Sequence, residues 1–114
     1  MKTQHAVVIA GGGPTGLMLA AELKLTGVDA LIIERSPTRE RPGSRGLGMH
    51  ARTLEILDQR GVADRFVSEG QKHPTIGFHT VPMSLSDFPS RHNYTLGLVQ
   101  KRSEQILAGW IRFV

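Results

Sequence analysis

Residues 11–16 read Gly-Gly-Gly-Pro-Thr-Gly, a G-x-G-x-x-G pattern that lies between an apolar run and a helical repeat. The run before it, His5–Ala10, is β-branched and apolar on both faces, as in a strand buried in a parallel sheet. From Pro14 the apolar residues recur at spacings of three and four, which predicts a helix that stops near Gly27. A second strand is expected at Ala30–Ile33. Strand, helix and strand in this order predict a right-handed parallel βαβ unit.

Each glycine of the pattern has its own expected role. Gly11 allows a tight turn, Gly13 lets a pyrophosphate approach the backbone, and Gly16 lets the helix pack against the strand. Pro14 fits the first helical position, where its missing N–H is no loss. The unpaired N–H groups and the positive end of the helix dipole would then face the phosphates. The pattern therefore predicts a dinucleotide site.

Glu34 ends the second expected strand, where an acidic group can accept hydrogen bonds from a ribose hydroxyl. NAD and FAD share an adenosine diphosphate half, so the spacing leaves both open. The charge of Glu34 disfavours a 2′-phosphate, although Arg35 beside it weakens this argument. NADP is therefore the least expected ligand of this first site.

The rest of the chain alternates between loops and short elements. A long loop is expected at residues 36–49, and loops of that length in compact domains are often functional. Residues 73–90 are poorly patterned, and their three prolines favour edge strands and turns. Further elements are expected as follows: helices at His50–Arg60 and Val62–Ser68, a strand at Tyr94–Val99, and a helix after Gln100 that carries Ile106, Leu107 and Trp110 on one stripe.

Length and composition exclude several classes of protein. A chain of 114 residues is expected to form one small domain, and without cysteine it has no disulfides or thiolate ligands. The apolar run near the N-terminus is too short for a signal peptide or a membrane span, so a cytoplasmic protein without membrane contact is expected. The net charge is +4, yet no aromatic residues are interleaved with the arginines, so no nucleic-acid partner is expected. The five histidines lack metal-ligand spacing, and no metal site is predicted.

Several segments together resemble the N-terminal part of FAD-dependent aromatic monooxygenases of the para-hydroxybenzoate hydroxylase type. The similarity is greatest to the branch that acts on polyketides and antibiotics such as rifampicin and tetracyclines. It runs from Ala6 to Ile111. The segments that carry it are Ala6–Ala20 with the glycine pattern, Ile33-Glu34-Arg35, Arg45-Gly46-Leu47, His50–Leu57 and Gln59-Arg60-Gly61.

The resemblance implies an α/β fold, a Rossmann-like βαβ FAD-binding fold with a parallel sheet. Residues 1–114 would form the N-terminal part of an FAD/NAD(P)-binding domain, incomplete in itself, with the substrate domain absent from this chain. In that case strand edges and the stripe around Trp110 would be exposed.

The resemblance also assigns cofactor-binding roles residue by residue. Arg45 would reach the FAD phosphates from the long loop, where its guanidinium offers a planar fork of donors. Gln100 would hydrogen-bond the cofactor on its ribityl side. The remaining positions are the pyrophosphate loop, Gly11, Gly13, Pro14, Thr15 and Gly16, and the ribose carboxylate Glu34 with Arg35 adjacent.

The implied activity is hydroxylation of an aromatic or polyketide substrate by O₂, with NADPH or NADH reducing the FAD. Because the cofactor carries the chemistry, no catalytic residue is expected in this segment. The implied partners are an aromatic small molecule, O₂ and the remaining part of the same enzyme. Two alternatives stay open: a fragment of an NAD-binding oxidoreductase, and a non-catalytic dinucleotide-binding remnant.

Overall fold

The computed structural model describes residues 2–38 and 46–113, and the chain divides into two compact units. None of the helices in these two ranges is long and apolar enough to cross a membrane. The first unit contains β1 (Val7–Ala10), α1 (Pro14–Leu25), β2 (Ala30–Ile33) and α4 (Gln100–Ile111) from Lys101 onward. The second contains β3 (Gly48–Met49), α2 (Ala51–Gln59), α3 (Ala63–Val67), β4 (Gln71–His73), β5 (Thr75–Phe78), β6 (Val81–Ser84) and β7 (Thr95–Gly97).

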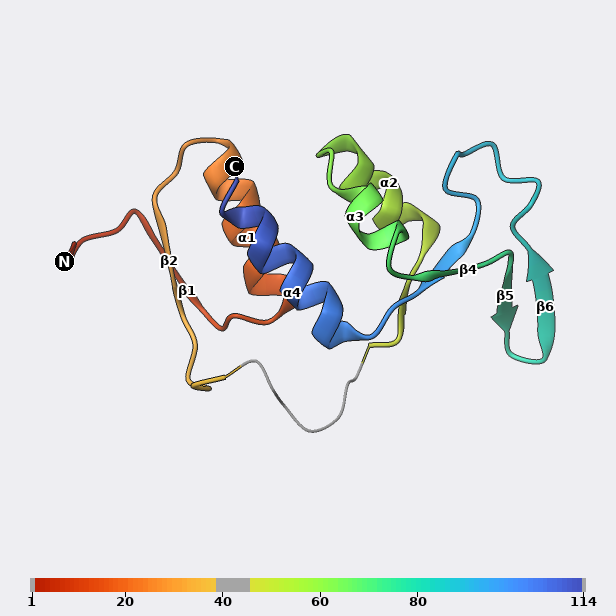
Figure 1. The fold of residues 1–114 in the computed structure, drawn as a ribbon, viewed down its shortest axis with the longest axis horizontal. Helices are drawn as coiled ribbons and strands as arrows, with labels where there is room; N and C mark the ends of the chain where they lie inside the picture. Colours follow the sequence, from red (N-terminus) through yellow and green to blue (C-terminus); the bar gives the residue numbers. More distant parts are fainter. Residues whose placement is uncertain (1, 39–45, 114) are drawn as a thin grey trace. The chain divides into compact units, whose positions relative to one another are not determined.

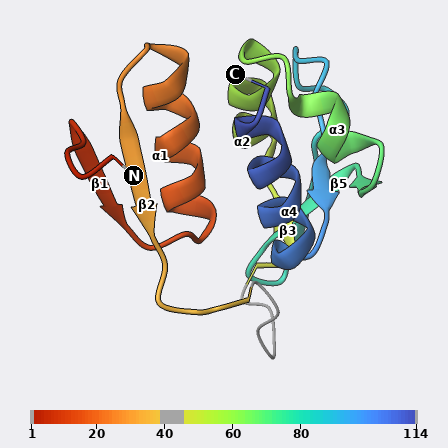
Figure 2. The same ribbon diagram turned by 60° about the vertical axis from the view of Figure 1, so that its left-hand side comes forward.

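The first unit is built on the predicted βαβ element. β1 and β2 pair in parallel, with Val7 opposite Ala30 and Ala10 opposite Ile33. The connecting helix α1 lies against both strands in both views (Figures 1 and 2). It ends before Gly27, whose φ of +77° is the left-handed conformation that glycine adopts most easily after a helix. The predicted α/β class and the predicted helix are therefore confirmed.

The expectation that β1 is buried on both faces is wrong within the described residues. Ile9 is 7% exposed, whereas its neighbour Val8 is 55% exposed. Successive strand residues point to opposite faces of a sheet, and Ile9 is the one that faces α1, close to Gly16. Because α1 covers one face of this two-stranded sheet, the residues on the other face, Val8 in β1 and Leu31 and Ile33 in β2, stay exposed.

Helix α4 runs beside α1 in the same direction. At one end, Glu104 lies close to Gly13, which precedes α1; at the other, Lys24 Nζ donates a 2.6 Å hydrogen bond to the carbonyl oxygen of Ile111. Figure 1 shows the two helices side by side. The expectation that the stripe around Trp110 would be exposed is wrong, because the apolar side of α4 is covered and Trp110 is only 5% exposed.

The second unit holds a small antiparallel sheet with strand order β3-β7-β4, a separate β5-β6 hairpin, and the helix pair α2-α3. The two predicted helices are present, and Gly61 separates them with a φ of +73°. The predicted strand at Tyr94–Val99 is present as the shorter β7. The loop predicted at residues 36–49 is too long at its end, because Gly48 and Met49 pair with β7 as strand β3.

A buried polar cluster joins α2 to the segment before β7. The Nδ1 atom of His92 lies 3.0 Å from the Tyr94 hydroxyl, and its Nε2 atom lies 3.3 Å from Asp58 Oδ2. Burial raises the pKa of the Tyr94 phenol, with smaller effects from Arg91, which lowers it, and from nearby aspartates, which raise it. His92 is 2% exposed, and the Tyr94 hydroxyl takes the place of water at its Nδ1 atom, whereas its buried Nε2 atom makes no hydrogen bond with any described residue despite lying near Asp58.

Candidate cofactor site

The loop between β1 and α1 has the backbone geometry that the glycine pattern predicts. Gly11 has a φ of +114°, which a side chain would strain, and its N–H donates to the carbonyl oxygen of Ile33 at 2.7 Å. The first bond of α1 runs from the N–H of Leu17 to the carbonyl of Gly13 at 2.9 Å. By helix geometry, the N–H groups of Gly13, Thr15 and Gly16 precede any intrahelical acceptor. They form the donor-rich end of the helix.

A β-carbon would meet different surroundings at Gly16 and at Gly13. A β-carbon on Gly16 would overlap the carbonyl oxygen of Gly11 and approach the Ile9 side chain to 3.3 Å. This agrees with the predicted role of Gly16 in packing the helix against the strand. A β-carbon on Gly13 would meet only Glu104 Oε1, at 3.8 Å. The space beside Gly13 is therefore open to a ligand, and its role in phosphate approach stays a prediction.

Glu34 is held in place by two backbone groups. Its Oε2 accepts a 2.8 Å hydrogen bond from the N–H of Gly12, and its Oε1 accepts a 3.0 Å bond from the N–H of Ser36. The sequence argument missed the contact with Gly12, because the spacing of Glu34 placed it near a ribose and said nothing of the loop. Adjacent parallel strands end at the same edge of a sheet, and this is the signal from which the contact can be inferred. The carboxylate is thereby oriented before any ligand binds.

A cavity of about 470 Å³ lies where β1 and β2 end. It brings together four of the predicted site residues, Gly11, Gly13, Glu34 and Arg35. Its lining is completed by Ala10 and Ile33. This edge of a parallel sheet, at the carboxyl ends of the strands, is where open α/β folds bind ligands.

The other predicted positions lie outside this cavity or outside the described residues. Pro14 is the first residue of α1, as predicted, and Thr15 is exposed in the first turn. Arg45 lies outside the described residues. Gln100 belongs to the second unit, where its Oε1 accepts a 3.1 Å hydrogen bond from the N–H of Gly46 and its own N–H donates to the Gly46 carbonyl at 2.9 Å. Gln100 is therefore bound to the residue that follows Arg45, and its contact with a cofactor stays a prediction.

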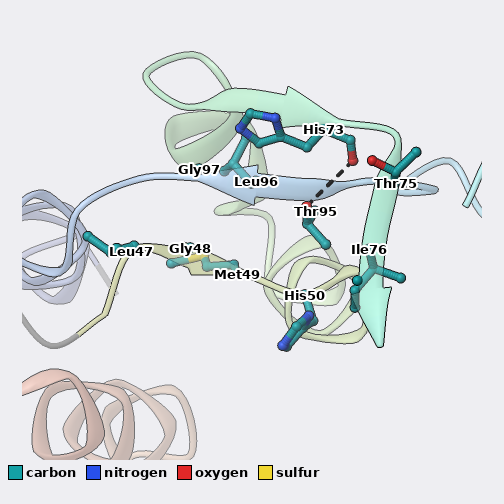
Figure 3. A pocket seen from close by; sticks show the side chains of 11 residues that line it. Leu47, Gly48, Met49, His50, His73, Thr75, Ile76, Thr95, Leu96 and Gly97 are labelled. Atoms are coloured by element: carbon teal, nitrogen blue, oxygen red, sulfur yellow. Dashed lines mark hydrogen bonds between the residues drawn. The ribbon is translucent and has the colours of Figure 1, made fainter. Parts of the chain in front are cut away.

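A second cavity, of about 390 Å³, lies in the second unit (Figure 3). Apolar side chains of Met49, Ile76 and Leu96 share it with the histidines at positions 50 and 73. Sequence reasoning assigned His50 only to a helix start, and it is indeed the residue that precedes α2. No pattern indicated this cavity, because the strands around it are two to four residues long.

In the described ranges, histidines, aspartates and glutamates do not gather in groups of three or more that could hold a metal ion. The chemistry of the glycine-loop cavity is therefore that of backbone donors, one oriented carboxylate and one guanidinium.

Comparison with known proteins identifies the family to which this chain belongs. The sequence model of the FAD binding domain matches residues 4–112. The chain belongs to the FAD binding domain family. This membership favours FAD over NAD as the dinucleotide. Together with the relatives and the solved structure described next, it confirms the predicted resemblance to FAD-dependent aromatic monooxygenases.

Two relatives of the FAD binding domain family show how much of such a protein this chain represents. It is 45% identical over 108 residues to a 12-dehydrotetracycline 5-monooxygenase/anhydrotetracycline 6-monooxygenase of Streptomyces rimosus, covering 93% of this chain and 21% of that protein. It is 42% identical over 109 residues to a rifampicin monooxygenase of Rhodococcus hoagii, covering 90% of this chain and 22% of that protein. The chain thus spans about a fifth of the length of these relatives.

The fold agrees with a solved member of the family. The structure of OxyS anhydrotetracycline hydroxylase from Streptomyces rimosus superposes with a TM-score of 0.89 at 44% sequence identity. The match covers 96% of this chain and 22% of that one. The arrangement of strands and helices described above is therefore that of a flavoprotein hydroxylase over this part of the chain.

Proposed function

We propose that this chain is the FAD-binding segment of an NAD(P)H-dependent flavoprotein monooxygenase. Residues 1–114 form the N-terminal part of its FAD/NAD(P)-binding domain. One observation carries the proposal: in a chain of the FAD binding domain family, a single cavity is lined by Gly11, Gly13, Glu34 and Arg35.

The residues around this cavity fit the adenosine diphosphate half of FAD. The N–H groups of Gly13, Thr15 and Gly16, with the positive end of the α1 dipole, bind the diphosphate. Gly11 and Pro14 shape the turn that aims these donors. The ribose hydroxyls donate to Glu34, which the N–H groups of Gly12 and Ser36 already orient. Arg35, on the same cavity wall, adds positive charge.

Two further residues, Arg45 and Gln100, are proposed to bind FAD, as the resemblance to the aromatic monooxygenases implies. We assign Arg45 to the FAD phosphates and Gln100 to the ribityl side. The two hydrogen bonds between Gln100 and Gly46 support this assignment, because they fix the residue next to Arg45.

FAD, when bound, supplies the redox and oxygen chemistry, and NADPH or NADH is the proposed reductant. The named activities of the relatives favour an aromatic or polyketide substrate and O₂ as the second substrate. This chain contributes binding and orientation, and none of its residues is proposed to be catalytic. The rest of the enzyme is the proposed partner, and the cytoplasm the proposed location.

The experiment that tests the proposal is a titration of FAD with the purified chain, followed by flavin fluorescence. Gly13→Val should abolish binding because its side chain fills the space beside the diphosphate. The nearest atom to the new β-carbon is 3.8 Å away, so the variant is expected to fold. Arg91→Ala is the matched control. Arg91 pairs with Asp58 and Asp64 in the second unit, whereas the glycine loop belongs to the first, so its loss should leave the affinity for FAD nearly unchanged.

Two outcomes would contradict the proposal. Equal affinity of the two variants would show that FAD does not use the glycine loop. Binding of NADH without binding of FAD would instead support the alternative of an NAD-binding oxidoreductase, which the same glycine loop and Glu34 also suit.

A further inference from the structure

The β5-β6 hairpin carries an apolar face that the described residues leave largely uncovered. By register, Ile76 lies opposite Met83 and Phe78 lies opposite Val81, and directly opposed residues share a face of the sheet. These four side chains form the apolar hairpin face. Phe78 and Val81 are more than half exposed, and Met83 is 49% exposed. Exposed apolar surface that is contiguous in this way marks an interaction site.

The hairpin has little support within its own unit. Its extensive packing is between its own two strands, and in Figure 1 it extends away from α2 and α3. It is anchored only at its base, where the N–H of Leu85 donates a 2.7 Å hydrogen bond to the carbonyl oxygen of Pro74 and the Leu85 side chain is buried. A two-stranded hairpin alone is marginally stable in water and needs a further layer against one face. The described part of the chain does not supply that layer.

The apolar hairpin face adjoins the second cavity (Figure 3). Thr75, Ile76 and Gly77 of β5 line this cavity of about 390 Å³, so Ile76 belongs to both surfaces. Further apolar lining comes from Met49 and Leu96. A hollow beside an apolar face is a shape that side chains of another protein layer can fill.

We propose that the apolar hairpin face and this cavity are bound by the remaining part of the same enzyme, whose apolar side chains pack on the face and enter the cavity. The proposal rests on the proposed function, in which the chain is one segment of a longer monooxygenase. Length favours this occupant. The chain spans 21% and 22% of the two relatives, so about four-fifths of each relative lies outside the matched segment.

The solved OxyS structure supports the same occupant. Its match covers 96% of this chain but only 22% of that one, so the fold described above persists in a protein with a much larger body attached. A second copy of this chain is the competing occupant. The two differ in one observable: coverage by a second copy depends on protein concentration, whereas coverage by the same polypeptide does not.

The test uses a full-length chimera, in which this chain replaces the matching segment of the 45% identical Streptomyces rimosus monooxygenase. Hydrogen peroxide converts exposed methionine to its sulfoxide, so the oxidation of Met83, followed by mass spectrometry, reports whether the face is covered. In the folded chimera Met83 should react about tenfold more slowly than in the same chimera unfolded in urea. If Met83 keeps its exposure of 49%, the two rates should differ by no more than about twofold.

A pair of variants of the chimera tests the energetic role of the face. Phe78→Ser should lower the thermal midpoint by about 5 °C or more, because it removes an aromatic side chain that the rest of the enzyme buries. Phe88→Ser is the matched control, since Phe88 is also more than half exposed and lies in the same unit, but outside the apolar hairpin face. Its replacement should shift the midpoint by no more than about 1 °C.

The outcomes separate this proposal from the function on which it rests. Rapid oxidation of Met83 in the folded chimera, or equal effects of the two substitutions, overturns the proposal, as does protection of Met83 that appears only when the protein concentration rises. If the chimera does not fold, residues 75–84 alone are grafted into the relative and the same measurements decide. A chimera that protects Met83 but binds no FAD contradicts the proposed cofactor role and leaves the docking surface in place.

Discussion

Gly16 and Gly13 differ in what surrounds them, and this difference predicts different costs of adding a methyl group. Gly16→Ala should lower the free energy of unfolding by about 1–3 kcal/mol, because the new β-carbon would overlap the Gly11 carbonyl and press on Ile9. Gly13→Ala should change it by no more than about 0.5 kcal/mol, since its new β-carbon makes an ordinary contact. Urea unfolding of the two variants measures this difference, and equal losses would contradict the packing role of Gly16.

The raised pKa of the Tyr94 phenol makes the free energy of unfolding depend on pH in the alkaline range. Burial raises the pKa of its phenol above the ordinary value of 10.0. The folded protein therefore holds the phenolic proton more tightly than the unfolded chain does. The stabilisation is complete below pH 10.0 and is lost as the pH rises through the higher pKa of the folded state.

Tyr94 is the only tyrosine of the chain, so tyrosinate absorbance reports its titration directly. The expected midpoint lies above 10.0 in the folded protein and falls to the ordinary value in urea. Tyr94→Phe should remove this part of the alkaline loss of stability. A folded-state midpoint at or below 10.0 would contradict the account of a buried phenol.

At the scale of elements, the βαβ unit was the most predictable part of the molecule. Its strands and helix are specified locally, by an apolar run, a glycine-rich turn and apolar residues that recur at spacings of three and four. Strands β3 and β4 were not predicted, because two or three residues carry no readable period, and their pairing with β7 joins segments far apart in the chain. The contact between Glu34 and Gly12 and the position of Glu104 beside Gly13 were not predicted either, because both depend on tertiary packing.

The β5-β6 hairpin has one apolar face, which its register makes explicit. Ile76 is opposite Met83 and Phe78 is opposite Val81, and directly opposed residues share a face. Phe78 is 74% exposed and Val81 is 56% exposed. Alternate pairs, Thr75 with Ser84 and Gly77 with Pro82, lie on the other face. Exposed apolar faces of this kind favour self-association.

Replacing exposed apolar side chains on that face should lower self-association with little loss of stability. The double variant Phe78→Thr/Val81→Thr is expected to reduce the concentration dependence of light scattering. Its free energy of unfolding should fall by no more than about 1 kcal/mol, the range of one cross-strand pair. The control Thr75→Ser/Ser84→Thr alters the opposite face and should scatter like the parent chain. If the two double variants show the same concentration dependence of light scattering, the apolar face of the hairpin is not the surface through which the chain associates.

At the scale of the whole molecule, cofactor binding and folding stability are linked. FAD that binds only the folded chain adds RT ln(1 + [FAD]/Kd) to the free energy of unfolding, about 2.7 kcal/mol at one hundred times Kd. The thermal midpoint should therefore rise with FAD concentration. NAD at equal concentration should raise it less, because NAD lacks the flavin half that Arg45 and Gln100 are proposed to bind.

In a Gln100→Ala variant the difference between the two dinucleotides should shrink. The contacts that remain intact, at Glu34 and the glycine loop, are those with the adenosine diphosphate half that both dinucleotides share. A midpoint that rises equally with both dinucleotides in the parent chain would mean that only the adenosine half is bound, and the roles proposed for Arg45 and Gln100 would be wrong even if those of the glycine loop were right.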